Sequence, residues 1–70
     1  MRLYIATLTD KNGSTRYVAE DGSLTSDRTA AERYFTKEMA ELFADPANQG
    51  IPASRRRALE IVGFAEPIEQ

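Results

Sequence analysis

The chain contains no cysteine, no histidine and no tryptophan. The absence of cysteine excludes disulfides, and with histidine missing as well the usual zinc ligands are lacking. A calcium site made of carboxylates needs a dense acidic loop with alternating ligands. The most acidic stretch, residues 20–27, does not have that spacing. We therefore expect no metal and no other cofactor.

The chain also lacks long apolar runs and a surplus of one charge. Its 70 residues carry a net charge of −2, with the two signs mixed along the sequence. No segment approaches the roughly 20 apolar residues of a membrane span, and we expect the first ten residues to form a strand rather than a signal peptide. A dedicated nucleic-acid binder usually has a strong basic surplus. We expect one domain over residues 1–70, in the cytoplasm, with no membrane partner.

Groups that support catalysis are scarce. Without histidine or cysteine, the candidates are serine, tyrosine, lysine and carboxylates, and the four glycines are scattered rather than gathered in a phosphate-binding loop. A catalytic carboxylate pair needs a cleft for its substrate. A 70-residue domain has little room for such a cleft. We predict that the protein is not an enzyme.

The first third of the chain has the pattern of a β-hairpin. Residues 2–9 alternate and are apolar on both faces, which predicts a central strand. Residues 10–14 contain Asn-Gly, a turn signal, and residues 15–20 form the expected return strand. Residues 23–25 are either a short further strand or the approach to a helix.

Two helices are expected next. Thr29 and Glu32 have the spacing of a capping box, with Asp27 as a competing cap, and predict a short helix over residues 28–34. Thr36 caps the main helix, residues 37–48. This helix ends at Asp45-Pro46, or Pro46 starts a last turn that stops at Gly50. The residues expected to face the core are Ala40, Phe43, Ala44 and Ala47, with Met39 and Leu42 widening the stripe.

The C-terminal part is ambiguous. Residues 58–64 suit a strand, and also a helix capped by Ser54 and stopped by Gly63. We favour the strand, because a two-stranded sheet alone is marginal, and we expect residues 66–70 to fray. The predicted fold is α+β: an antiparallel sheet of about three strands (2–9, 15–20 and 58–64) with the two helices packed on one face.

Residues 17–41 resemble a type of small protein found in phages and other mobile elements. Such proteins carry a hairpin reading Tyr-Val-x-x-Asp-Gly-x-Leu-Thr, then Ala-x-Arg-aromatic and Thr-x-Glu-x-Ala. The matching residues are Tyr17, Val18, Asp21, Gly22, Leu24, Thr25, Asp27, Ala31, Arg33, Tyr34, Thr36, Glu38 and Ala40. Size and composition are also similar to those of anti-CRISPR inhibitors. The resemblance implies a β-β-α-β arrangement and an accessory protein that sterically inhibits a host protein complex.

Two features are candidates for partner binding. Tyr34 and Phe35 are adjacent aromatics that cannot both enter a small core. We expect Phe35 to be partly exposed between Arg33 and Lys37, since aromatics and arginine dominate interface hot spots; the alternative is that it packs under residues 45–54. Arg55, Arg56 and Arg57 can bind acidic side chains or phosphates, or simply form a solvated approach to the last strand, paired in part with Glu60, Glu66 or Glu69.

Two other functions stay open. Weak nucleic-acid binding would use the three arginines together with a tyrosine face. That face requires Tyr4 and Tyr17 to lie opposite each other, flanked by Arg2 and Arg16, although the same pair can simply stabilise the sheet. The third alternative is a structural protein that self-associates through strand edges or helices. The sequence does not fix the oligomeric state.

Overall fold

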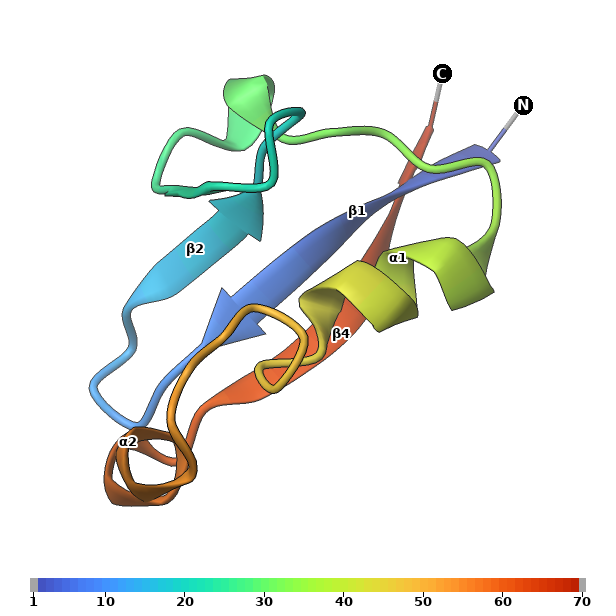
Figure 1. Ribbon diagram of the computed structural model, residues 1–70. Coiled ribbons are helices and arrows are strands. Elements are labelled where there is room, and N and C mark those ends of the chain that lie inside the picture. Colours follow the sequence, from blue (N-terminus) through green and yellow to red (C-terminus); the bar gives the residue numbers. More distant parts are fainter. Residues whose placement is uncertain (1, 70) are drawn as a thin grey trace.

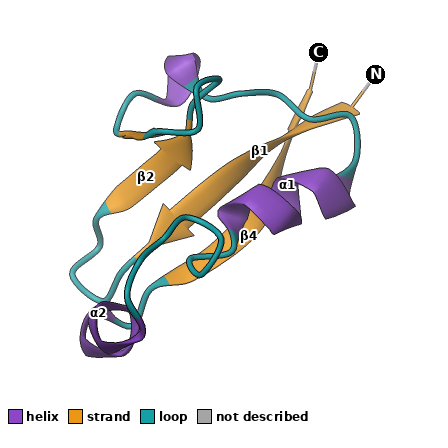
Figure 2. Ribbon diagram, in the orientation of Figure 1, coloured by secondary structure: helices purple, strands orange, loops and turns teal. Residues whose placement is uncertain are grey.

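A computed structural model describes residues 2–69, and the side chains of residues 3–68. It shows an antiparallel sheet with strand order β3-β2-β1-β4 and helices in front of one face and beside one end (Figure 1, Figure 2). The elements are β1 (Arg2–Thr9), β2 (Thr15–Val18), β3 (Leu24–Thr25), the 3-10 helix η1 (Arg28–Ala30), α1 (Lys37–Ala44), α2 (Ala53–Leu59) and β4 (Val62–Glu69). The predicted α+β class is confirmed, with four strands rather than three.

β1 is the central strand, as its two apolar faces predict. It pairs with β2 on one side and with β4 on the other, and Leu3, Ile5, Ala6, Thr7 and Leu8 are all buried. The turn into β2 is held by the Asp10 carboxylate, which accepts hydrogen bonds from the amides of Asn12 and Ser14. Gly13 takes a positive φ of 83° there, which explains the Asn-Gly signal.

The strand predicted over residues 58–64 is correct only in part: residues 62–64 belong to β4, whereas residues 58 and 59 are helical. Residues 53–59 form α2, which begins after Pro52 and ends where Glu60 adopts a left-handed φ of 51°. Its alanine, arginine and leucine content favours a helix. β4 starts only at Val62 and pairs with β1 along its whole length, so the expected fraying of residues 66–70 is wrong as far as residue 69. The long free edge of β1 gives this tail its hydrogen-bonding partners.

Pro67 is compatible with β4 because of the hydrogen-bonding pattern of its partner. Pro67 lies opposite Tyr4, whose amide and carbonyl both bond to Tyr34 at 2.9 and 2.7 Å, on the other side of β1. The Tyr4–Pro67 pair is therefore not a hydrogen-bonded pair, and the missing N–H of Pro67 faces the open edge of the sheet.

Three other predicted elements are longer than those in the structure. The helix predicted over residues 28–34 is only η1, capped by Asp27 rather than Thr29, because residues 31–34 bond instead to the sheet. The main helix predicted over residues 37–48 ends at Ala44, and a turn from Pro46 closes at Gly50. The strand predicted over residues 15–20 ends at Val18. Thr36 does cap α1, accepting from the Met39 amide at 3.2 Å.

α1 lies very close to the sheet. Its buried residues are Ala40 and Ala44, and a Cβ placed on Gly63 of β4 would overlap the backbone carbonyl of Ala44. The core on this side consists of Ala6, Leu8, Val18 and Ala44, with Tyr34, Ile51 and Ile61 packed against it. Small residues on both sides of the contact allow this approach.

Arg28 lies over the other face of the sheet. Its guanidinium is 5.9 Å from the ring centre of Tyr17 on β2, within cation–π range, and it pairs with Glu66 on β4. Tyr17 lies opposite Thr7, so Tyr17 and Tyr4 are on opposite faces of the sheet. The predicted Tyr4–Tyr17 pair is therefore wrong, and so is the tyrosine face built on it.

Candidate functional site

The outward side of α1 carries large apolar side chains in solvent. Met39 is 47% exposed and Leu42 is 55% exposed, and Phe35, just before the helix, is 74% exposed. Met39 and Leu42 are spaced i and i+3 within α1, so they are neighbours on the helix surface, and Phe35 lies directly before the cap residue Thr36. We call Phe35, Met39 and Leu42 the α1 patch.

The geometry of the helix explains why these side chains point outward. At 3.6 residues per turn, Leu42 lies about 180° from the midpoint between Ala40 and Ala44, the two residues buried against the sheet. Sequence reasoning placed Met39 and Leu42 in the core stripe, and that was wrong. The helix sequence shows two different sides, with Met39 and Leu42 on one and Ala40 and Ala44 on the other. It does not show which side faces the sheet, because that depends on the close contact with Gly63 of β4.

Contacts of Tyr34 hold the backbone next to Phe35, the first residue of the α1 patch, in place. Tyr34 makes two backbone hydrogen bonds to Tyr4, and its ring stacks on Phe43 with centres 5.1 Å apart and planes 15° apart. Burial, together with the charge of Glu32, raises the pKa of the Tyr34 hydroxyl. Phe35 therefore stands between an anchored tyrosine and the helix cap Thr36, on a backbone held in place from both sides.

The predicted residues Arg33, Phe35 and Lys37 lie together at this end of α1. All three are exposed, and Phe35 does not pack under residues 45–54. Arg33 and Lys37 form a basic end of the α1 patch, whereas Glu38 and Glu41 on the helix form an acidic flank. The patch thus has an apolar centre and a charged rim, the usual anatomy of a protein interface.

The predicted Arg55–Arg57 cluster lies elsewhere. All three arginines are on α2 rather than in an approach to a strand, with Arg55 and Arg57 exposed and Arg56 half-buried. The end of α2 is fixed to the hairpin turn, where the Lys11 amide bonds to the Leu59 carbonyl. Phe35 instead adjoins Tyr34, which bonds to Tyr4. Tyr4 lies five residues before the end of β1 at Thr9, or roughly 17 Å from the hairpin end of the strand. The structure therefore separates the two predicted groups.

The loop after α1 completes the helix. The side chains of Asn48 and Gln49 donate hydrogen bonds to the carbonyls of Leu42 and Phe43 at 2.9 and 2.7 Å. Carbonyls in the last turn of a helix have no hydrogen-bonding partner within the helix itself. Figure 1 shows this loop between α1 and α2. Residues 45–50 therefore stabilise the end of the α1 patch rather than cover it.

The edges of the sheet are poorly suited to pairing with another chain. β3 has two residues, and Pro67 removes one of the N–H groups that β4 would present outward. Short edges and edge prolines are common ways of preventing such pairing. Within residues 2–69, no helix is long and apolar enough to cross a membrane, and no cluster of acidic side chains is arranged to hold a metal ion.

Comparisons of this chain with protein-family models, with curated proteins and with solved structures find no match.

Proposed function

We propose that this protein is a non-catalytic binding module that contacts a partner protein through the α1 patch. The observation that carries the proposal is the orientation of α1, which buries its alanines and exposes Met39 and Leu42. A helix stabilised only by its own fold would gain from the opposite arrangement, because burying a leucine or methionine is worth about 1.5–3 kcal/mol. A partner groove supplies that burial.

The partner surface should be an apolar groove with charged borders. Phe35 is the most exposed of the three anchors at 74%, and burying an aromatic ring in a pocket is typical of an interface hot spot. Arg33 and Lys37 at one end favour acidic side chains on the partner, and Glu38 with Glu41 favours basic ones along the flank.

The proposed mode of action is steric inhibition. The resemblance of residues 17–41 to small phage and mobile-element proteins supports a host protein or protein complex as the partner, in the host cytoplasm. By occupying a groove on that complex, the protein would block the other ligands of the complex and so act as an anti-CRISPR-type inhibitor. No chemistry on the partner is needed, which agrees with a sequence that lacks histidine and cysteine.

The test compares binding by matched surface variants. The tagged protein is used to capture partners from host cells, and the partner is then purified and titrated. Phe35→Ala and Leu42→Gln should each weaken binding by about tenfold or more. The control Val62→Thr changes an apolar side chain of similar exposure, 56%, outside the α1 patch, and should bind like the wild type.

A partner held equally well by Phe35→Ala, Leu42→Gln and the wild type would refute the proposed surface. Inhibition is tested separately, by adding the protein to the purified host complex. Loss of the complex's activity with wild-type protein, and its retention with Leu42→Gln, is the expected result. Full activity with bound wild-type protein would contradict steric inhibition while leaving binding intact.

A further inference from the structure

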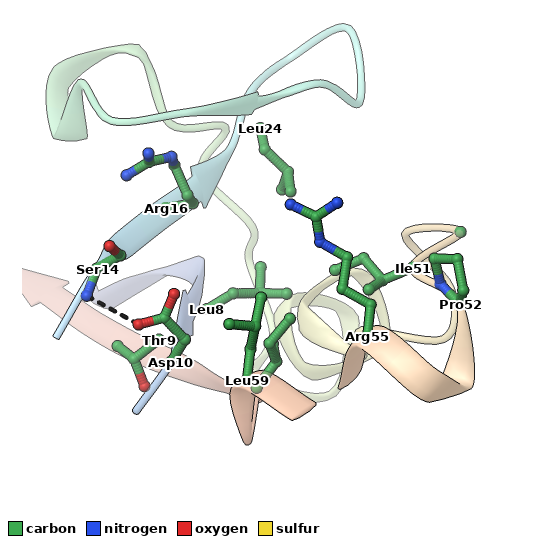
Figure 3. A pocket seen from close by; sticks show the side chains of 12 residues that line it. Leu8, Thr9, Asp10, Ser14, Arg16, Leu24, Ile51, Pro52, Arg55 and Leu59 are labelled. Atoms are coloured by element: carbon green, nitrogen blue, oxygen red, sulfur yellow. Dashed lines mark hydrogen bonds between the residues drawn. The ribbon is translucent and has the colours of Figure 1, made fainter. Parts of the chain in front are cut away.

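A second site lies between the sheet and α2. A pocket of about 380 Å³ is bordered by β1 and β2, by Leu24 of β3, by the loop at residues 50–52 and by α2 (Figure 3). Ligand pockets in proteins have volumes of roughly 300–1,000 Å³. At about 30 Å³ for each water molecule, this pocket has room for a small ligand of roughly ten non-hydrogen atoms.

The base of the pocket is apolar. Leu8 from β1, Ile51 from the loop and Leu59 from α2 come together there, as Figure 3 shows. Leu24 stands on one wall and is 40% exposed, although it belongs to a strand of only two residues. A ligand with an apolar body would cover this leucine and gain from each apolar contact.

The rim of the pocket is positively charged. Arg16 on β2 and Arg55 on α2 border the pocket from opposite sides; in Figure 3 the Arg55 side chain extends toward Leu24, whereas the Arg16 guanidinium points away from Arg55. Among the side chains of residues 3–68, no carboxylate forms a salt bridge with either guanidinium; Arg16 donates to the carbonyl of Thr15 at 3.0 Å. The one acidic lining residue, Asp10, uses a carboxylate oxygen for two backbone amides of its turn.

We propose that this pocket binds an organic anion, with a carboxylate group held by Arg55 and an apolar body on Leu8, Leu24 and Leu59. A guanidinium group recognises a carboxylate through paired hydrogen bonds. The anion is either a free small molecule or the C-terminal carboxylate of a peptide ending in an apolar residue. The site is separate from the α1 patch and does not depend on the function proposed for it.

The first experiment uses the wild-type protein and NMR titration of its backbone amides. The probes are 3-phenylpropanoate, its neutral amide 3-phenylpropanamide, and a tetrapeptide ending in phenylalanine, as free acid and as amide. At least one of the two acids should give saturable shifts at Leu8, Leu24, Ile51 and Leu59, and its amide should bind about tenfold more weakly. Which acid binds more tightly identifies the source of the anion.

The second experiment uses a matched pair of variants on α2. Arg55→Gln should weaken binding of the acid by about tenfold, whereas Arg57→Gln, on the same helix but outside the pocket lining, should leave it unchanged. The proposal is overturned if neither acid shifts the pocket residues, if acid and amide bind alike, or if Arg57→Gln weakens binding as much as Arg55→Gln.

Discussion

Gly63 of β4 and Ala44 of α1 are packed backbone against backbone. A Cβ on Gly63 would overlap the carbonyl oxygen of Ala44, so only glycine permits the observed separation between helix and sheet. This contact explains the α1 patch. Because α1 lies so close to the sheet, only alanine side chains fit between the two, and the large side chains of the helix point to solvent.

The Gly63–Ala44 contact predicts that Gly63→Ala is destabilising. The added methyl group forces α1 away from the sheet, and overpacking of this kind costs about 1–3 kcal/mol. Chemical denaturation measures the change in unfolding free energy. Val62→Ala, at the neighbouring exposed position of β4, should change it by only about 0.5 kcal/mol. Equal stability of Gly63→Ala and the wild type would mean that the helix is not held at this distance.

We predict that the exposed residues of α1 determine binding, whereas its buried alanines determine stability. Leu42→Gln replaces a side chain in solvent and should change the unfolding free energy by no more than about 0.5 kcal/mol. Ala40→Leu, in contrast, inserts three carbons into the buried contact and should cost about 1–3 kcal/mol. Thermal or chemical unfolding of the two variants checks this, and a large loss of stability in Leu42→Gln would place that leucine in the core.

We predict that Pro67 limits self-association of the protein through the edge of β4. Pro67→Val restores an outward N–H on β4, and an edge strand with its full set of donors is a template for pairing. Light scattering across a concentration series should show a higher mean mass for Pro67→Val than for the wild type. Pro52→Val, before α2, should match the wild type. Identical masses for all three proteins would show that this edge does not limit association.

The raised pKa of Tyr34 predicts that the unfolding free energy falls at alkaline pH. Burial and then Glu32 raise the pKa of its hydroxyl above the ordinary value of 10.0. In the unfolded chain the phenol ionises near that ordinary value, so its contribution to stability is complete below pH 10 and is lost as pH rises through the folded pKa. Tyr34→Phe should flatten the decline of unfolding free energy above pH 10, and Glu32→Gln should reduce it in part. An unchanged decline in Tyr34→Phe would contradict this assignment.

Local patterns predicted the elements that depend on local physics. The alternation of residues 2–9 identified the central strand, Asn-Gly the hairpin turn, and Thr36 the start of α1. The failures concern pairing between distant segments. Residues 62–69 form a strand because β1 offers a free edge there. Pro67, which by itself favours fraying, is tolerated because Tyr4 directs its hydrogen bonds to Tyr34.

The candidate site was only partly predictable, for a similar reason. Phe35 was identified because two adjacent aromatics cannot both enter a small core, and the structure does expose it. The exposure of Met39 and Leu42 could not be read from the helix alone, since the depth of α1 depends on Gly63 in another element. The separation of Arg55–Arg57 from Phe35 likewise depends on where α2 joins the hairpin turn.

Site-specific photo-crosslinking in host cells tests most directly whether the α1 patch contacts a partner protein. A photoreactive phenylalanine analogue is placed at position 42 in one protein and at position 62 in another, two positions of nearly equal exposure, 55% and 56%. We expect a discrete crosslinked protein from position 42, lost when Phe35→Ala is added, and none from position 62. The same products from both positions, or a crosslink at position 42 that survives Phe35→Ala, would contradict this expectation.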